Sequence, residues 1–151
     1  MKVLALAVAA VGLFAGTASA QSWEAVAAAD SAVMAVDWKS LSIDRTNRSV
    51  TLAVVPNAAG AASAGFDYGV TSVTIDCTTP RYRTNYSDFY YLNGQASTER
   101  FTGDGSWENI NDGSLILDVR TEVCSSNASR PGFFHDAITF AGAARTILDQ
   151  Q

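Results

Sequence analysis

The only place where a base and a carboxylate are neighbours in the sequence is His135-Asp136. A general base needs a partner that orients its ring, and adjacent residues on a helix point about 100° apart. The G-x-S-x-G motif, which would supply a nucleophile, does not occur in the chain. We therefore expect a surface histidine here and no catalytic residue.

Four further carboxylates, Asp104, Glu108, Asp112 and Asp118, follow one another closely along the chain. Their spacing differs from the D-x-D-x-D-G order of a calcium loop and is typical of turns and of a helix start. A glycosidase-type pair is defined by distance in space, so sequence spacing leaves that use open. We expect no metal, cofactor or catalytic role for these residues.

Cys77 and Cys124 are the only cysteines. Because the chain has one histidine and no C-x-x-C spacing, a metal site is disfavoured. In an exported protein an even number of cysteines usually forms a disulfide, and the alternative is a pair of buried thiols. A bond between them would remove about 4 kcal/mol of entropy from the unfolded chain.

The first twenty residues have the order of a secretory signal peptide. Lys2 precedes an apolar run over Val3–Ala15, and Ala18-Ser19-Ala20 is a small-x-small cleavage site. A transmembrane anchor is the alternative, but thirteen residues of helix span only about 20 Å. We expect cleavage before Gln21 and an exported protein, in the periplasm or extracellular space.

The remaining chain, residues 21–151, has the length of one domain. The leader takes away Lys2 and no acidic residue, so the net charge falls from −5 to −6. Nucleic acids and anionic membranes need a basic surface, so neither is an expected partner. The expected first mature residue is Gln21 and not a cysteine, and we therefore expect no lipid anchor on the mature N-terminus.

Alternating apolar residues predict a mostly β chain up to about residue 103. The predicted strands are Val33–Asp37 with Trp38–Ile43, Ser49–Val55, Tyr68–Cys77, Arg81–Leu92 and Gln95–Phe101, with turns at Asp44–Arg48 and Asn93-Gly94 and a loop over Pro56–Gly65. Val50 and Leu52 share one face of their strand, while Ala53 and Val55 indicate a partly covered second face. Cys77 ends its strand on the apolar face, which suits a bond to an element packed there.

After Gly103 the apolar residues change to helical spacing. Ile116, Val119 and Val123 predict a helix ending near Cys124, with the hydroxyl of Ser114 as its N-cap. The three consecutive apolar residues 115–117 leave a strand as the alternative.

The apolar spacing in the tail, residues 126–151, predicts a second helix. Pro131 suits a helix start, and Phe134, Ile138, Ala141 and Leu148 recur at helical spacing. A short helix is marginal alone, so this stripe must lie on the domain's own sheet, on a second copy or on a partner. We expect the sheet and its first helix to be complete without it.

Residues spread over 23–125 resemble the surface-adhesin protein E-like family of small exported bacterial proteins. The matching residues are Trp23, Val36-Asp37 with Ser40-Leu41, Ile75-Asp76-Cys77, Arg81-Tyr82-Arg83, Tyr91 with Gly94, Trp107 with Ile110, Gly113-Ser114 and Val123-Cys124. The resemblance implies a single antiparallel sheet of about six strands, with a helix held on it by a Cys77–Cys124 bond. It also implies binding rather than catalysis, with host extracellular matrix proteins as the partners of its namesake.

These observations predict an α+β protein divided into a signal peptide (1–20), a surface-adhesin E-like domain (21–125) and a tail (126–151). The predicted function is that of a non-enzymatic, adhesin-like binding module of the bacterial envelope, with a protein as partner. One alternative is a small periplasmic hydrolase with an unrecognised site. Another is a structural accessory that docks on an envelope protein through its tail helix.

Overall fold

The protein is an α+β fold built on one antiparallel sheet, as the sequence predicts. A computed structural model describes residues 22–150, so the predicted leader and its cleavage site lie outside the described residues. The strands are β1 (Trp23–Ala29), β2 (Ala32–Asp44), β3 (Asn47–Pro56), β4 (Tyr68–Asp76), β5 (Arg81–Tyr90), β6 (Phe101–Thr102) and β7 (Glu108–Asn109). The helices are α1 (Ala58–Ala64), α2 (Leu115–Ser125) and α3 (Ala137–Leu148).

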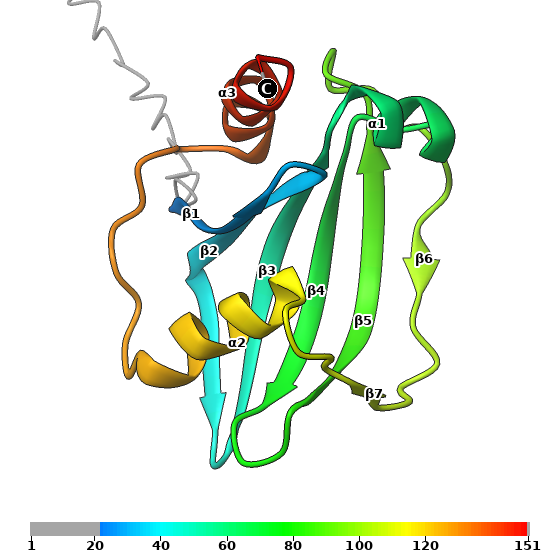
Figure 1. Cartoon of the computed structure of the whole chain (residues 1–151). Helices are drawn as coiled ribbons and strands as arrows, with labels where there is room; N and C mark the ends of the chain where they lie inside the picture. The colour runs from blue at the N-terminus through cyan, green and yellow to red at the C-terminus, as the bar shows by residue number, and fades with distance from the viewer. Residues whose placement is uncertain (1–21, 151) are drawn as a thin grey trace, which may run out of the picture.

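The first five strands lie in chain order, each antiparallel to the next, and β6 and β7 both pair with β5 (Figure 1). Arg45 takes a positive φ of 53° in the tight turn that joins β2 to β3. β2 is one strand of 13 residues, with an irregular register between Asp37 and Ser42. Within that irregularity the Ser40 hydroxyl donates to the Asp37 carbonyl and accepts the Thr51 amide, so the backbone groups there stay bonded.

The two longer helices pack on opposite faces of the sheet. Along β4, Tyr68 and Val70 pack with α3, whereas Val73 and Ile75 pack with α2. Even and odd positions of a strand point to opposite sides, so these two pairs belong to different faces. We call them the α3 face and the α2 face. Figure 1 shows α2 crossing the lower part of the sheet and α3 at its upper end, so each helix covers only part of its face.

The upper half of the α3 face is closed by the tail helix. The buried residues of this cluster are Phe140, Ala141, Ala144 and Leu148 from α3, with Trp23, Val33, Ala35, Ala53, Val55 and Tyr68 from the strands. Ala35 and Ala53 are fully buried, and their small side chains let the helix lie close to the strands. The apolar stripe of the tail therefore lies on the protein's own sheet, one of the three positions considered from the sequence.

The lower half of the α2 face is closed by α2 and a disulfide. Val119 and Val123 are fully buried against residues of β2, β3 and β4. Cys77, just after β4, is bonded to Cys124 with Cα atoms 5.5 Å apart, as predicted. The Arg120 side chain donates to the carbonyls of Asp76 and Cys77 at 3.1 and 2.8 Å.

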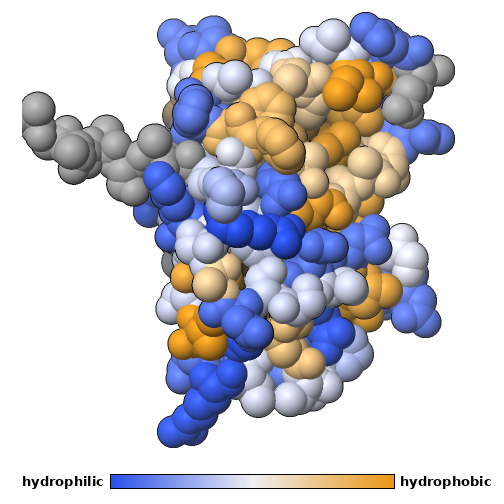
Figure 2. All heavy atoms as spheres, turned by 90° about the vertical axis from the view of Figure 1, so that its left-hand side faces the viewer, coloured by the Kyte–Doolittle hydropathy of each residue, from blue (hydrophilic) through white to orange (hydrophobic). Residues whose placement is uncertain are grey.

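Residues 126–136 carry the chain from one face to the other, outside β1 (Figure 1). The Arg130 guanidinium lies 3.9 Å from the Trp38 ring centroid and forms ion pairs with Glu24 and Glu122. Gly132 is pressed against β1, where an added Cβ would lie 2.5 Å from the Trp23 carbonyl oxygen. This side of the molecule is seen in Figure 2, with hydrophobic residues gathered in its upper part and a hydrophilic band across its middle. The linker is therefore anchored by specific contacts.

Two predicted segments differ in the structure. The predicted loop over Pro56–Gly65 contains the helix α1, because Asn57 accepts the Gly60 amide as its N-cap and Gly65 ends it with a φ of 78°. The returning strand predicted over Gln95–Phe101 was wrong. The turn at Asn93-Gly94 forms, but β6 has only two residues, because the polar residues between offer no apolar face to pack.

The helix starts also differ in detail. α3 begins after Asp136, whose carboxylate accepts the Thr139 amide at 2.7 Å, and not at Pro131. Ser114 is the N-cap residue of α2, but its hydroxyl donates backwards to the Asn111 carbonyl instead of accepting from the helix. Among residues 22–150, no helix is both long and apolar enough to cross a membrane.

Candidate functional site

His135 and Asp136 are neighbours in the sequence, but no hydrogen bond joins them among residues 22–150. His135 is exposed, and the Asp136 carboxylate is occupied by capping α3. Hydrogen bonds from Thr139, with a smaller contribution from the nearby His135, hold the pKa of Asp136 below its usual range. The carboxylate therefore serves the helix start, and the imidazole points to solvent without an orienting partner.

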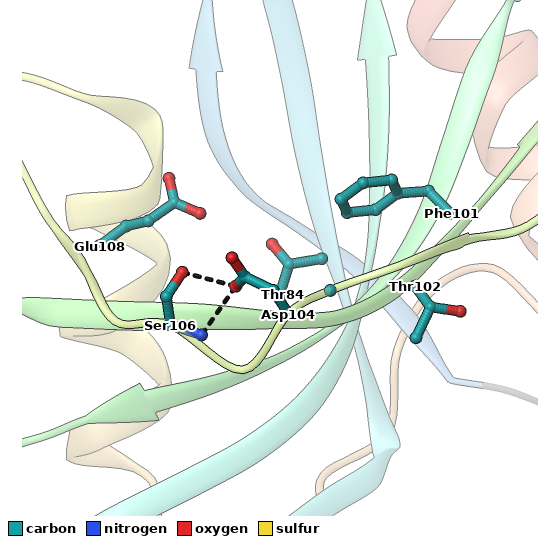
Figure 3. A pocket seen from close by; sticks show the side chains of 7 residues that line it. Thr84, Phe101, Thr102, Asp104, Ser106 and Glu108 are labelled. Atoms are coloured by element: carbon teal, nitrogen blue, oxygen red, sulfur yellow. Dashed lines mark hydrogen bonds between the residues drawn. The ribbon is translucent and has the colours of Figure 1, made fainter.

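Two of the four carboxylates, Asp104 and Glu108, share a hollow of about 280 Å³ at the β5 edge (Figure 3). The Asp104 carboxylate accepts both the hydroxyl and the amide of Ser106, at 2.6 and 2.8 Å. These bonds hold the pKa of Asp104 below its usual range, so it stays ionised and is a poor proton donor at neutral pH. Glu108 accepts from the Tyr82 hydroxyl at 3.2 Å. This arrangement stabilises a turn and a strand end.

The other two carboxylates lie elsewhere, Asp112 in a turn and Asp118 in the first turn of α2. An acidic residue there favours the helix dipole, as expected from the sequence. Within residues 22–150, no group of three or more His, Cys, Asp or Glu side chains is placed to hold a metal ion. The structure thus brings Asp104 and Glu108 together and leaves Asp112 and Asp118 apart from them.

A different surface carries the more specific arrangement, the lower half of the α3 face, which neither α2 nor α3 covers. Eight of the residues that the strand register places on it are Ser49 and Thr51 of β3, Ser72, Thr74 and Asp76 of β4, and Arg81, Arg83 and Tyr86 of β5. We call this surface the open half. All eight are polar or aromatic, in contrast to the apolar residues above them on the same strands.

Short polar side chains of the open half are bonded to one another. The Thr74 hydroxyl lies 3.0 Å from that of Ser49, and the Asn85 amide donates to Ser72 and Thr74, each at 3.2 Å. Asn85 sits at the register irregularity of β5, which turns it towards β4. These bonds order the side chains of the surface, since each hydroxyl fixes its neighbour.

Arginines stacked on aromatic rings form one side of the open half. The guanidinium carbons of Arg81 and Arg83 lie 4.8 and 5.1 Å from the Trp107 ring centroid, and that of Arg100 lies 4.3 Å from Tyr86. Such stacking holds the guanidinium by cation–π attraction and leaves its N–H groups free for other partners. The segment that carries Trp107 is fixed by close packing, because an added Cβ at Gly103 would lie 1.8 Å from the Thr84 carbonyl oxygen.

Arg83 differs from its two neighbours in lacking a carboxylate. Arg81 is paired with Asp76 at 3.0 Å, and Arg100 forms two bonds to Asp88 at 2.8 and 2.7 Å. Arg83 takes part in no ion pair among residues 22–150, and its Nε is enclosed without a hydrogen bond. A half-buried guanidinium outside any ion pair is a strong binding site for an anion, because its N–H groups donate charge-assisted bonds, which exceed neutral ones in strength.

Sequence reasoning did not identify this surface. Of the β5 tyrosines, Tyr86 lies on the open half and Tyr82 on the α2 face. Arg81 and Arg83 are two residues apart, which on a strand places both on one face, and this spacing was the available signal. Nothing in the spacing points to Trp107, because its position depends on the pairing of β7 with β5.

Comparisons with known proteins add no family to this description. No family model, no curated protein and no solved structure matches the chain. The resemblance to the surface-adhesin E-like family therefore stays a prediction from the residues.

Proposed function

We propose that this protein is an exported, non-enzymatic binding module that holds a protein partner on the open half of the α3 face. The single observation that carries the proposal is Arg83, stacked near Trp107 and without a carboxylate of its own. The partner supplies that carboxylate from an acidic side chain. The module acts in the bacterial envelope or after release from it.

The local charge supports this choice of partner. The protein is acidic overall, with a net charge of −5, yet three of its ten lysines and arginines lie on or beside this one surface. Two of these arginines are neutralised by Asp76 and Asp88, so Arg83 contributes the unbalanced charge. Arginine binds carboxylates in a planar, two-bond geometry, which favours an acidic side chain as the group that it recognises.

The composition of the surface supports a protein as the partner. Arginine, tryptophan and tyrosine are the residues most enriched where truncation weakens protein complexes. Arg83, Trp107 and Tyr86 lie next to the ordered hydroxyls of Ser49, Ser72 and Thr74, which can bond to a polypeptide backbone. A flat polar floor beside aromatic and cationic side chains suits an interface better than a small-molecule pocket.

Site-specific photo-crosslinking in the native envelope tests the proposal. A photoreactive residue replaces Thr51, which lies on the open half beside Ser72, or, as the matched control, the exposed Thr121 of α2. We expect a discrete protein adduct from position 51 and none from position 121. In the Arg83→Gln variant the yield of that adduct should fall about tenfold, the scale of a residue that dominates an interface.

The variant must stay folded for this comparison. Gln is shorter than Arg but keeps a polar, hydrogen-bonding end without the charge, and Arg83 forms no ion pair within residues 22–150, so the unfolding midpoint of Arg83→Gln should stay close to that of the unchanged protein. Identical adducts from positions 51 and 121, or an adduct that persists in the Arg83→Gln variant, would show that the open half is not the contact surface.

A further inference from the structure

A second hollow lies at the opposite end of the same face, between the N-terminus of α3 and the upper strands. It has a volume of about 250 Å³, and its lining includes Tyr68, Val70, Tyr90, Asp136 and Ile138. The rings of Tyr68 and Tyr90 are stacked, with centroids 5.3 Å apart and planes at 21°. The walls are therefore aromatic and aliphatic, with few polar groups.

The first polar group is the hydroxyl of Tyr68. The residue is only 4 % exposed, and its hydroxyl makes no hydrogen bond to any residue that the structure describes. The enclosed side-chain atoms without a hydrogen bond belong to Arg48, Arg83 and Arg145, so the Tyr68 oxygen is not sealed in the core. The hydroxyl is free to bond a molecule in the hollow.

The second polar group is the carboxylate of Asp136. One oxygen accepts the Thr139 amide, and the other has no hydrogen bond among residues 22–150. Hydrogen bonding by Thr139 holds the pKa of this carboxyl low, so it is ionised at neutral pH. Burial first, then Tyr90 and last the charge of Asp136 raise the pKa of Tyr68. The carboxylate and the hydroxyl thus act in one electrostatic environment.

The charges near the hollow are otherwise occupied. The Arg100 guanidinium, which acts on Tyr90, is bound in two bonds by Asp88. His135 is adjacent to Asp136 and exposed. The partial positive charge at the start of α3 is already met by Asp136, as an N-cap carboxylate does. No described lysine or arginine lines the hollow, so its net character is anionic and aromatic.

We propose that this hollow binds a small organic ammonium ion, a protonated amine with an apolar body. Its N–H groups donate to the free oxygen of Asp136 and to the Tyr68 hydroxyl oxygen, and its apolar part packs on Tyr90, Val70 and Ile138. Aromatic rings also attract a cation directly. An anion is repelled by Asp136, and a neutral apolar molecule leaves both polar groups without a partner.

Titration of the full chain with two probes of equal shape tests this proposal. The probes are 2-phenylethylammonium and 2-phenylethanol, which differ in the charge at one end, and calorimetry measures their affinities. We expect the ammonium to bind at least about tenfold more tightly, because only its charged N–H groups make charge-assisted bonds to the Asp136 carboxylate. Equal affinities, or no binding of the ammonium up to about 10 mM, would overturn the proposal.

Three variants locate the site. Asp136→Asn keeps the N-cap, because Asn caps helices as well as Asp, and it should reduce ammonium binding to the level of the alcohol. Tyr68→Phe should weaken ammonium binding several-fold, by one hydrogen bond. The matched control is Asp104→Asn, a carboxylate in a similar turn at the other hollow, which should leave binding unchanged. An unchanged preference for the ammonium in Asp136→Asn contradicts the assignment.

This inference does not depend on the proposed protein-binding function. Arg83→Gln should leave ammonium binding unchanged, because Arg83 is not among the residues that line this hollow. Asp136→Asn should likewise leave crosslinking from position 51 unchanged. Each proposal is therefore refuted by its own variant.

Discussion

The α3 face has two halves built on the same strands, and they differ in every property that bears on function. In the upper half, Tyr68 and Val70 of β4 lie under α3, whereas in the lower half Ser72, Thr74 and Asp76 of the same strand face outwards. The change from apolar to polar within one strand marks where the covering helix stops. If the residues along this face of β4 were all apolar or all polar, the sequence would not show where the cover of α3 ends.

The α2 face shows the opposite arrangement. Its lower half is apolar under α2, through Val73 and Ile75, while its upper half continues with Gly69 and Thr71. The two helices therefore cover diagonal quarters of the sheet. The open half of the α3 face is the back of the most tightly closed part of the α2 face, so a rigid floor supports it.

Removal of α3, which covers the upper half of the α3 face, should have the largest effect on stability. Deleting residues 126–151 exposes Trp23, Val55 and Tyr68, and removes the buried Phe140 and Leu148. Each large apolar side chain contributes about 1.5–3 kcal/mol when buried, and a whole domain is stable by only about 5–15 kcal/mol. We expect the truncated protein to lose its cooperative unfolding transition, measured by circular dichroism against temperature and urea.

A point substitution keeps this test informative when truncation simply prevents folding. Phe140→Ala should lower the free energy of unfolding by about 3–5 kcal/mol. The matched control is Phe133→Ala in the linker, where a side chain 83 % exposed should change little. A truncated protein that still unfolds cooperatively would instead support the sequence-based expectation that residues 21–125 are complete without the tail.

The sequence predicted the cover on both sides of the sheet where one strand, β3, carries apolar residues on both of its faces. Val50 and Leu52 alternate with Ala53 and Val55, and the structure places the first pair under α2 and the second under α3. Apolar residues on both faces of one strand indicate that a helix packs on each side of the sheet. The bond between Cys77 and Cys124 was also predictable, from the apolar side of the strand on which Cys77 ends.

The missed features depend on contacts between distant segments or on residues without periodicity. α1 consists of alanine, glycine and serine, so only its caps, Asn57 and Gly65, marked it as a helix. Predicting the open half would have required knowing the pairing Tyr82↔Glu108, because this pairing brings Trp107 beside Arg83 from a distant part of the chain. Sequence spacing carries no information on such a pairing, because it is set by how β7 meets the sheet edge.

The second test weakens the covered half of the α2 face. Replacing Cys77 and Cys124 by serine removes a bond that closes 47 residues, and we expect about 4 kcal/mol less stability in urea. The fold should persist, because Val119 and Val123 remain buried and Arg120 still holds the end of β4. Ser125→Ala is the matched control outside the bond. An unchanged midpoint in urea would mean that the closed loop contributes nothing to stability.

The smallest expected effect on stability is that of Asp76, a residue of the open half whose carboxylate is fixed by several hydrogen bonds. Its carboxylate accepts the hydroxyl and amide of Thr78, the amide of Thr79 and the Nε of Arg81. These bonds, those of Thr78 first, hold the pKa of Asp76 far below its usual range. The ionised form is therefore favoured by folding.

The sign of the pH dependence follows from that direction. The folded pKa is lower than the unfolded one, so the stabilisation is complete above about pH 4 and is lost as the pH falls towards the folded pKa. Asp76→Asn should destabilise the protein at pH 7, measured by urea unfolding, and the difference from the unchanged protein should shrink between about pH 4 and 2. Asp104→Asn is the control, because the exposed Asp104 bonds only within its own turn and should show a smaller difference. A difference for Asp76→Asn that is the same at pH 7 and at the acid end would mean that the side chain acts by shape alone, and that its charge does not hold the lower edge of the open half.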